Sequence, residues 1–159
     1  MIRARPLAAA LAAVLAAACS SEPSAGAGAT VRIERSGGAW EIPVEISADP
    51  SSRERGWMGR TSLPPDRGML FLYPRVEPRQ FWMKDCLIPI DAAFVDESGQ
   101  IVNVVEMHPP ADPSDPERYR SAVPVRIVLE MPGGWFHARG VGAGDRVVLS
   151  EAARAVVPR

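Results

Sequence analysis

The most distinctive candidate for chemistry in this sequence is a single lysine. Lys84 is the only lysine among 18 basic residues. Its ammonium group is a compact point charge, so it could bind an anionic or polar group of a ligand, in a pocket that Asp91 and Glu130 also border. The alternative is structural, with Lys84 in an ion pair with Asp85 or Asp91. The sequence alone leaves both interpretations open.

Arg60 is a second candidate ligand-binding residue. A guanidinium group can bind a carboxylate or a phosphate through two parallel hydrogen bonds. The alternative for Arg60 is an ion pair with Glu54, Asp66 or Asp91 across a helix and a loop.

The aromatic residues supply the third kind of candidate. Core packing accounts for most of them, but tryptophan is rarely wholly buried. We therefore expect Trp57 or Trp82 to lie on a ligand surface, where a flat indole suits the apolar face of a saccharide. The predicted ligand-binding set is Arg60, Trp82, Lys84, Asp91 and Glu130.

Motifs of the common hydrolases and nucleotide-binding enzymes are absent from the sequence. There is no Gly-x-Ser-x-Gly, no His-Glu-x-x-His and no phosphate-binding loop. Methionine and histidine select copper, but no Met-x-x-Met, His-x-x-x-His or Cys-x-x-Cys spacing occurs. We expect neither a metal nor a cofactor. Asp91 and Glu130 could do acid–base work if their separation suits it, so an enzymatic function stays open.

The first 18 residues have the layout of a secretory signal peptide. Arg3 and Arg5 precede the apolar run 7–18, and Cys19 follows three alanines directly. This arrangement resembles a bacterial lipoprotein signal, in which the cysteine is acylated and becomes the new amino terminus. Ordinary secretion is the alternative, and the run is shorter than the about 20 residues of a membrane span. We predict an exported protein that a lipid on Cys19 anchors to a membrane, facing the periplasm or the cell surface.

Residues 19–29 lack large apolar side chains and are expected to form the anchor and a flexible tether. Cys86 is then an unpaired thiol in an exported protein. We expect it to be a small, half-buried apolar side chain.

Composition restricts the partners and the number of domains. With 18 basic and 19 acidic residues the formal net charge is −1, so a nucleic-acid partner is not expected. The predicted organisation is a signal peptide over residues 1–18, the tether over 19–29, one domain over 30–150 and a frayed tail over 151–159.

Alternating apolar residues predict a β-hairpin at the start of this domain. Its strands are expected over residues 31–35 and 40–47, with a turn at Gly37 and Gly38. Pro43 has no amide donor, so it should lie at an edge or a bulge. Asp49 and Pro50 predict a helix start, followed by a short surface helix over 51–58 that Gly59 ends.

The rest of the domain consists of short apolar runs separated by turn residues. Strands are expected over residues 68–73, 80–83, 92–95, 101–107, 125–131 and 146–149. Many short strands with few helices predict a mainly β fold, an antiparallel barrel or sandwich with one or two short helices. The proline-rich stretch 108–117 is expected to be a functional or mobile loop.

An ordered series of motifs resembles the bacterial and archaeal family known as domain of unknown function 192. These motifs include Arg55–Arg60, Gly68–Phe71, Phe81–Asp85 and Ile88–Asp91, with further matches around Tyr119, Glu130 and Gly144. The resemblance covers residues 30–150 and implies a single small β-rich domain, often behind an export signal, with no settled activity. The chain has Trp57 where the family usually has an aliphatic residue, and Asp85 and Cys86 where Asn and Thr are more common.

Three functions follow as hypotheses. The first is an envelope module that binds a small ligand or an envelope component. The second is a small enzyme acting on a saccharide or a cell-wall component. The third is a structural or protein-partner domain without a small ligand.

Overall fold

The computed structural model describes residues 28–159, and their first element is the predicted hairpin. Strand β1 (Thr30–Arg35) pairs antiparallel with β2 (Gly38–Ser47). Pro43 pairs only with Thr30, at the end of β1, because the pairing of β2 with its other neighbour begins at Val44. The missing amide donor of Pro43 therefore costs no hydrogen bond on the side of β2 that faces its other neighbour.

Helix α1 (Pro50–Arg55) starts where the sequence predicts and ends earlier. The Asp49 carboxylate accepts hydrogen bonds from the amides of Ser51 and Ser52, and the Ser52 hydroxyl accepts one from the Asp49 amide, which is a capping box. The predicted end at Gly59 is wrong. Gly56 ends the helix because it adopts a positive φ of 43° and donates its N–H to the Ser52 carbonyl.

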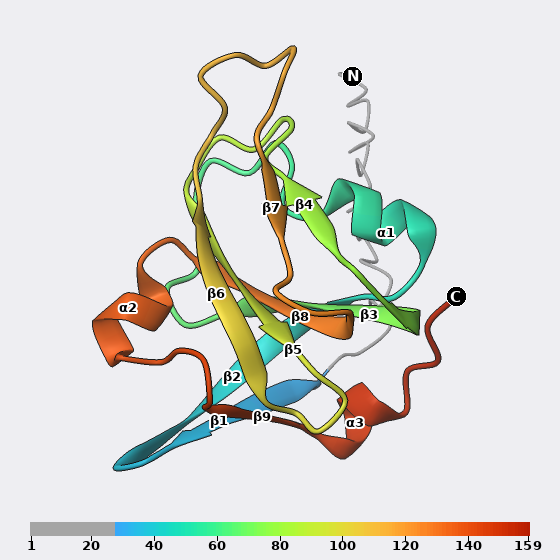
Figure 1. Ribbon diagram of the computed structural model, residues 1–159, viewed down its shortest axis with the longest axis vertical. Coiled ribbons are helices and arrows are strands. Elements are labelled where there is room, and N and C mark those ends of the chain that lie inside the picture. Colours follow the sequence, from blue (N-terminus) through green and yellow to red (C-terminus); the bar gives the residue numbers. More distant parts are fainter. Residues whose placement is uncertain (1–27) are drawn as a thin grey trace, which may run out of the picture.

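The mainly β fold is confirmed, with nine strands and three short helices within residues 28–159. The remaining elements are β3 (Gly68–Glu77), β4 (Gln80–Trp82), β5 (Ile90–Val95), β6 (Ile101–Met107), β7 (Arg118–Arg120), β8 (Val125–Pro132), α2 (Trp135–Arg139), β9 (Arg146–Leu149) and α3 (Glu151–Arg154). Every predicted strand is present. Strand β7, which the sequence did not predict, follows the 108–117 loop that projects from one end of the molecule in Figure 1.

Seven strands form one curled sheet in the order β6-β5-β8-β3-β2-β1-β9. All neighbours are antiparallel except β2 and β3, whose connection carries α1 and so allows a parallel pair. A single bridge between Gln100 and Arg146 joins the two outermost strands, which curls the sheet into a half-barrel. Strands β4 and β7 pair separately as a two-stranded ribbon, which lies with α1 over one side of the sheet (Figure 1).

Both faces of the sheet are buried, against two separate apolar clusters. The inner cluster fills the half-barrel and includes Leu70 and Leu129. The outer cluster includes Phe71 and Val128, the next residues on the same two strands, and is covered by Trp57 after α1 and by the β4–β7 ribbon. Every buried member of both clusters falls within residues 29–153, so this segment carries its own core.

The two ends of the domain meet. Thr30 donates its amide to the Ser150 hydroxyl and accepts the Ser150 amide, both at 3.0 Å. The segment after Ser150 is not frayed as predicted, because α3 begins there and Arg159 donates its amide to the Ala48 carbonyl at 2.8 Å. No helix in residues 28–159 has the length and apolar character that a membrane crossing requires. The predicted signal, lipid anchor and most of the tether lie outside the described residues.

Candidate functional site

The five predicted ligand-binding residues do not surround one cavity. In the ladder between β5 and β8, Asp91 lies opposite Met131, and Ala92 lies opposite Glu130. Because side chains alternate along a strand, Asp91 and Glu130 point to opposite faces of the sheet. The predicted pocket shared by Lys84, Asp91 and Glu130 is therefore not formed.

Asp91 holds the start of helix α2. Its carboxylate accepts the Gly134 amide at 3.0 Å and the Phe136 amide at 3.3 Å, and the residue is only 1% exposed. Burial raises the pKa of Asp91, while the two amide hydrogen bonds oppose that rise. With both carboxylate oxygens bonded to the backbone, Asp91 acts as a buried helix cap.

Arg60 is engaged in an ion pair that the sequence did not predict. Its guanidinium donates two hydrogen bonds to Glu45 on β2, at 2.9 and 2.7 Å, instead of pairing with Glu54, Asp66 or Asp91. It also stacks 4.4 Å from the centre of the Trp57 ring. The hydrogen bonds and charge of Arg60 hold the pKa of Glu45 below its usual value.

Trp82 lies between two cations on the surface. The residue is 38% exposed, with the Arg118 guanidinium 4.4 Å and the Lys84 ammonium 5.5 Å from the centre of its ring. Within residues 28–159 neither cation has an acidic partner within ion-pair distance, so the predicted pairing of Lys84 with Asp85 or Asp91 is not formed. Arg118 is brought here by the register of the ribbon, in which it lies opposite Trp82.

Glu130 lies at a small cavity on the outer face of the sheet. This Glu130 cavity has a volume of about 40 Å³ and lies between β8, the end of α1 and the segment after β4, with Trp57, Trp82, Met83 and Cys86 in its walls. Of the five predicted residues, only Trp82 and Glu130 line it. A hydrogen bond from the Gly59 amide to the Asp85 carbonyl, at 2.9 Å, fixes the two loops that carry Trp57 and Cys86.

Two polar side chains that line this cavity are buried. Glu130 is 5% exposed, and Trp57 is 1% exposed. The indole N–H of Trp57 makes no hydrogen bond of normal geometry within residues 28–159. It lies close enough to the Glu130 carboxyl to lower the pKa of that group, which offsets part of the rise that burial causes. Buried polar groups without partners are rare in folded proteins and indicate a functional role or a bound molecule.

The cavity changes the ionisation of its acidic groups. Burial raises the pKa of Glu130 from 4.5 to about 8, so this carboxyl is mostly protonated at pH 7. Burial and the nearby Glu130 raise the pKa of the Cys86 thiol to about 11, which makes it a poor nucleophile. Glu130 and Trp57 therefore present neutral hydrogen-bonding groups to the cavity: an acid O–H that donates, an acid carbonyl that accepts and an indole N–H that donates. Three charged residues, Arg53, Glu54 and Arg55, also line it.

Sequence reasoning named Glu130 and Trp82, and offered Trp57 as the alternative to Trp82, but it did not bring these residues together with Cys86 or Arg118. The signals for Glu130 were the family motifs and a possible pairing with Asp91. No comparable signal pointed to the Trp57 N–H, to Cys86 beside Glu130, or to Arg118 beside Trp82. Within residues 28–159 no three His, Cys, Asp or Glu side chains gather in a way that could hold a metal ion.

Comparisons with known proteins identify the family. No curated protein matches the chain. A crystal structure of a Sinorhizobium meliloti 1021 protein, provisionally described as a transcription regulator, is 36% identical with a TM-score of 0.67, over 76% of this chain and 92% of that one. A Novosphingobium aromaticivorans DSM 12444 protein of unknown function is 30% identical with a TM-score of 0.67, over 75% of this chain and 83% of that one. The model of the DUF192 family, described as uncharacterized ACR, COG1430, matches residues 31–149, and the chain therefore belongs to this family.

Proposed function

We propose that this protein is a lipid-anchored envelope module that binds a small hydroxylated ligand at the Glu130 cavity. The observation that carries the proposal is a buried carboxyl, Glu130, that lines one cavity together with the buried indole of Trp57, whose N–H makes no hydrogen bond of normal geometry within residues 28–159. The layout of residues 1–19 supports export and lipidation at Cys19.

The size of the cavity sets how much of the ligand enters it. A volume of about 40 Å³ suits one small polar group, because a single water needs about 10 to 15 Å³ measured in this way. A hydroxyl or hydroxymethyl group fits, since it both donates and accepts hydrogen bonds and so satisfies the protonated Glu130 and the Trp57 N–H together.

The rim of the cavity favours a negative charge on the rest of the ligand. Trp82 lines the cavity and also lies on the surface, with Lys84 and Arg118 beside its ring. Two cations without acidic partners attract an anionic substituent, and the charged residues in the cavity wall, Arg53, Glu54 and Arg55, also carry a net positive charge. The ligand class that fits both regions is an acidic sugar or a related hydroxy acid of the cell envelope.

A second candidate function is a small enzyme that uses Glu130 as a general acid. The raised pKa favours it, because an acid with a pKa of about 8 still holds its proton at neutral pH. Asp91, the expected partner carboxylate, lies on the other face of the sheet, which weighs against a reaction that needs this pair. In this case Glu130→Gln abolishes turnover, while a binding module loses only affinity.

The ligand proposal is tested with residues 28–159 by calorimetric titration of glucuronate, with glucose and lactate for comparison. Glu130→Leu and Trp57→Phe are expected to weaken glucuronate binding by about tenfold each, because each removes a hydrogen-bonding group from the cavity. Glu97→Gln, at an exposed turn, serves as the control and keeps the wild-type affinity. Equal affinities in all four proteins, or no saturable binding of any of the three probes, would contradict the proposal and favour a structural role.

The anchor is tested separately with the full chain. Cys19→Ser is expected to abolish lipid labelling and to move the protein from the membrane fraction to the soluble fraction. Unchanged labelling and fractionation would contradict lipidation and leave the ligand proposal untouched.

A further inference from the structure

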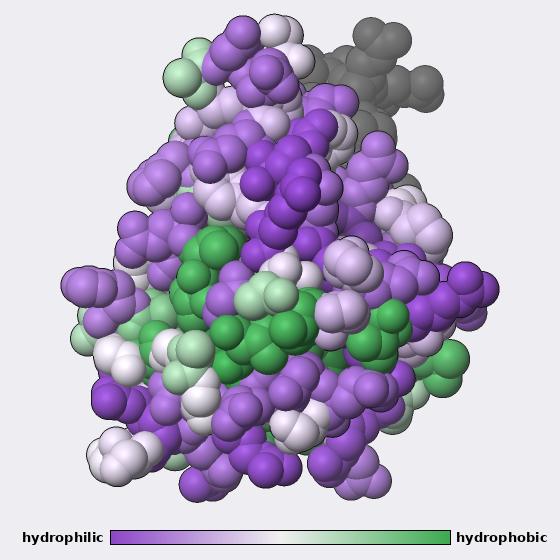
Figure 2. All heavy atoms as spheres, in the orientation of Figure 1, coloured by the Kyte–Doolittle hydropathy of each residue, from purple (hydrophilic) through white to green (hydrophobic). Residues whose placement is uncertain are grey.

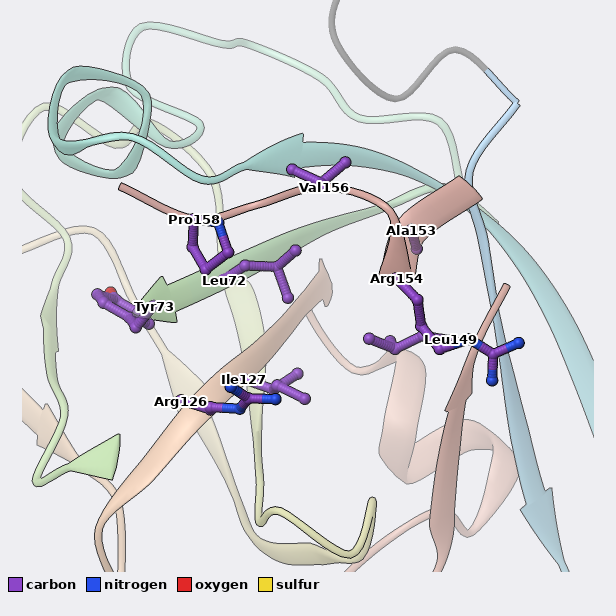
Figure 3. A pocket seen from close by; sticks show the side chains of 9 residues that line it. All are labelled: Leu72, Tyr73, Arg126, Ile127, Leu149, Ala153, Arg154, Val156 and Pro158. Carbon is purple, nitrogen blue, oxygen red and sulfur yellow. The ribbon is translucent and has the colours of Figure 1, made fainter. Parts of the chain in front are cut away.

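A second cavity opens at the inner face of the sheet, next to the C-terminal segment (Figure 3). This C-terminal cavity has a volume of about 100 Å³, and its apolar walls come from β3, β8, β9 and the residues after α3, namely Leu72, Ile127, Leu149, Val156 and Pro158. Figure 2 shows apolar residues as a band across the middle of one face of the molecule.

Arginines surround this cavity. Arg126 and Arg154 line it on two sides, and neither has an acidic partner within ion-pair distance in residues 28–159. Tyr73, in the same wall, lies between Arg53 and Arg79, whose guanidinium groups are 4.9 and 3.8 Å from its ring.

A neighbouring surface hollow shares Tyr73 and adds Arg75 to this group. The one acidic residue that lines either hollow is Glu77, which is already paired with Arg79 at 3.2 Å. The region therefore combines an apolar cavity with a positively charged rim.

We propose that the C-terminal cavity binds a small amphiphilic anion from solution, a carboxylate or phosphate monoester with a short aliphatic chain. The chain end enters between Leu72, Ile127 and Leu149, and the anionic head lies at one of the two arginines, Arg126 or Arg154, which lie on different sides of the cavity (Figure 3). The cavity is smaller than the about 150 Å³ apolar cavity that takes benzene, so it accepts a short chain end and excludes a ring system.

The C-terminal segment forms one wall of this site. Val156 and Pro158 line the cavity, and the segment is held by the Arg159 amide on the Ala48 carbonyl and by the Arg53 guanidinium on the Arg159 carbonyl, at 2.8 and 2.6 Å. A bound chain packs against this wall, so binding should slow amide exchange in residues 156–159.

The experiment is a methyl NMR titration of residues 28–159 with hexanoate and hexyl phosphate. Saturable shifts are expected at Leu72, Ile127, Leu149 and Val156. Hexanol and inorganic phosphate, which each carry half of the chemistry, are expected to bind at least tenfold more weakly.

Variants locate the anionic head. The double variant Arg126→Gln/Arg154→Gln is expected to weaken hexanoate binding by about tenfold. Arg32→Gln, on the opposite side of β1 from the buried Val31 and Ile33, is the matched control and keeps the affinity. Glu130→Gln also keeps it, which separates this site from the Glu130 cavity.

Three results would overturn the inference. The first is the absence of saturable shifts, and the second is hexanoate binding that the double arginine variant leaves unchanged. The third is binding only to vesicles of phosphatidylcholine with phosphatidylglycerol and not to hexanoate, which would assign the arginines to a bilayer surface instead.

Discussion

Replacing Glu130 with glutamine should make the domain more stable at neutral pH, although the residue is buried at the candidate site. The pKa of this carboxyl is raised from 4.5 to about 8 by burial in the folded protein. Between these values the unfolded chain gives up the proton and the folded chain keeps it. Glu130 therefore stabilises the fold fully below pH 4.5, and this contribution is lost as the pH rises through about 8.

The size of the effect follows from the two pKa values. The difference between 4.5 and about 8 corresponds to about 5 kcal/mol in the free energy of unfolding. About 3 kcal/mol of that is already lost at pH 7. Glutamine has nearly the shape of the protonated acid and does not ionise in this range, so Glu130→Gln should match the wild type near pH 4.5 and exceed its stability by about 3 kcal/mol at pH 7.

Urea unfolding of both proteins, followed by tryptophan fluorescence from pH 4.5 to 9, measures this difference directly. Ionisation of all other groups is common to both proteins and cancels in the comparison. Glu97→Gln, an exposed control, should follow the wild type at every pH. Parallel curves for the wild type and Glu130→Gln would refute the reasoning, because they would mean that Glu130 ionises equally easily in the folded and unfolded chains.

Three further outcomes are expected. Asp91→Ala should lower the free energy of unfolding by about 2 to 4 kcal/mol in urea titrations, because the amides of Gly134 and Phe136 at the start of α2 lose their acceptor. The folded variant should keep its affinity at the Glu130 cavity. Unchanged stability would contradict the capping role. Gly99→Ala should lower the free energy of unfolding by about 1 to 3 kcal/mol, because Gly99 has a φ of 87° and an added Cβ would lie 2.7 Å from the Val147 carbonyl oxygen. Gly142→Ala, where the added Cβ meets open space, should change it by no more than about 0.5 kcal/mol. Equal effects of the two substitutions would argue against the close approach at Gly99. Alkylation of Cys86 by iodoacetamide at pH 7.5, followed by mass spectrometry, should be roughly a hundredfold slower in the native protein than in urea, because burial raises its pKa to about 11; equal rates would show an accessible, normal thiol.

Local patterns in the sequence predicted most of the strands, because each depends on neighbouring residues. The hairpin follows from alternation around Gly37, and the start of α1 follows from the Asp49 cap. Two features depend on partners far along the chain and were not predictable in this way. They are the parallel pairing of β2 with β3, and β7, whose three residues form a strand only against β4.

The same limit applies to the candidate site. The family motifs and a possible pairing with Asp91 pointed to Glu130, but the register between β5 and β8 decides that Asp91 faces the other way. For Lys84 the sequence left open a ligand-binding role and an ion pair with Asp85 or Asp91. The contact of Lys84 is the Trp82 ring instead, beside Arg118, which arrives from the unpredicted β7.

The meeting of Thr30 and Ser150 has a consequence for how this domain can be combined with other sequences. Because these two residues are joined by two hydrogen bonds of 3.0 Å, the first strand begins beside the residue that follows the last strand, and only α3 and the short segment up to Arg159 continue from there. Such a unit can be inserted into a surface loop of a host protein with little displacement of either flank. It is also suited to circular permutation, with a short linker across the old ends and new ends opened in the exposed stretch from Asp112 to Asp115.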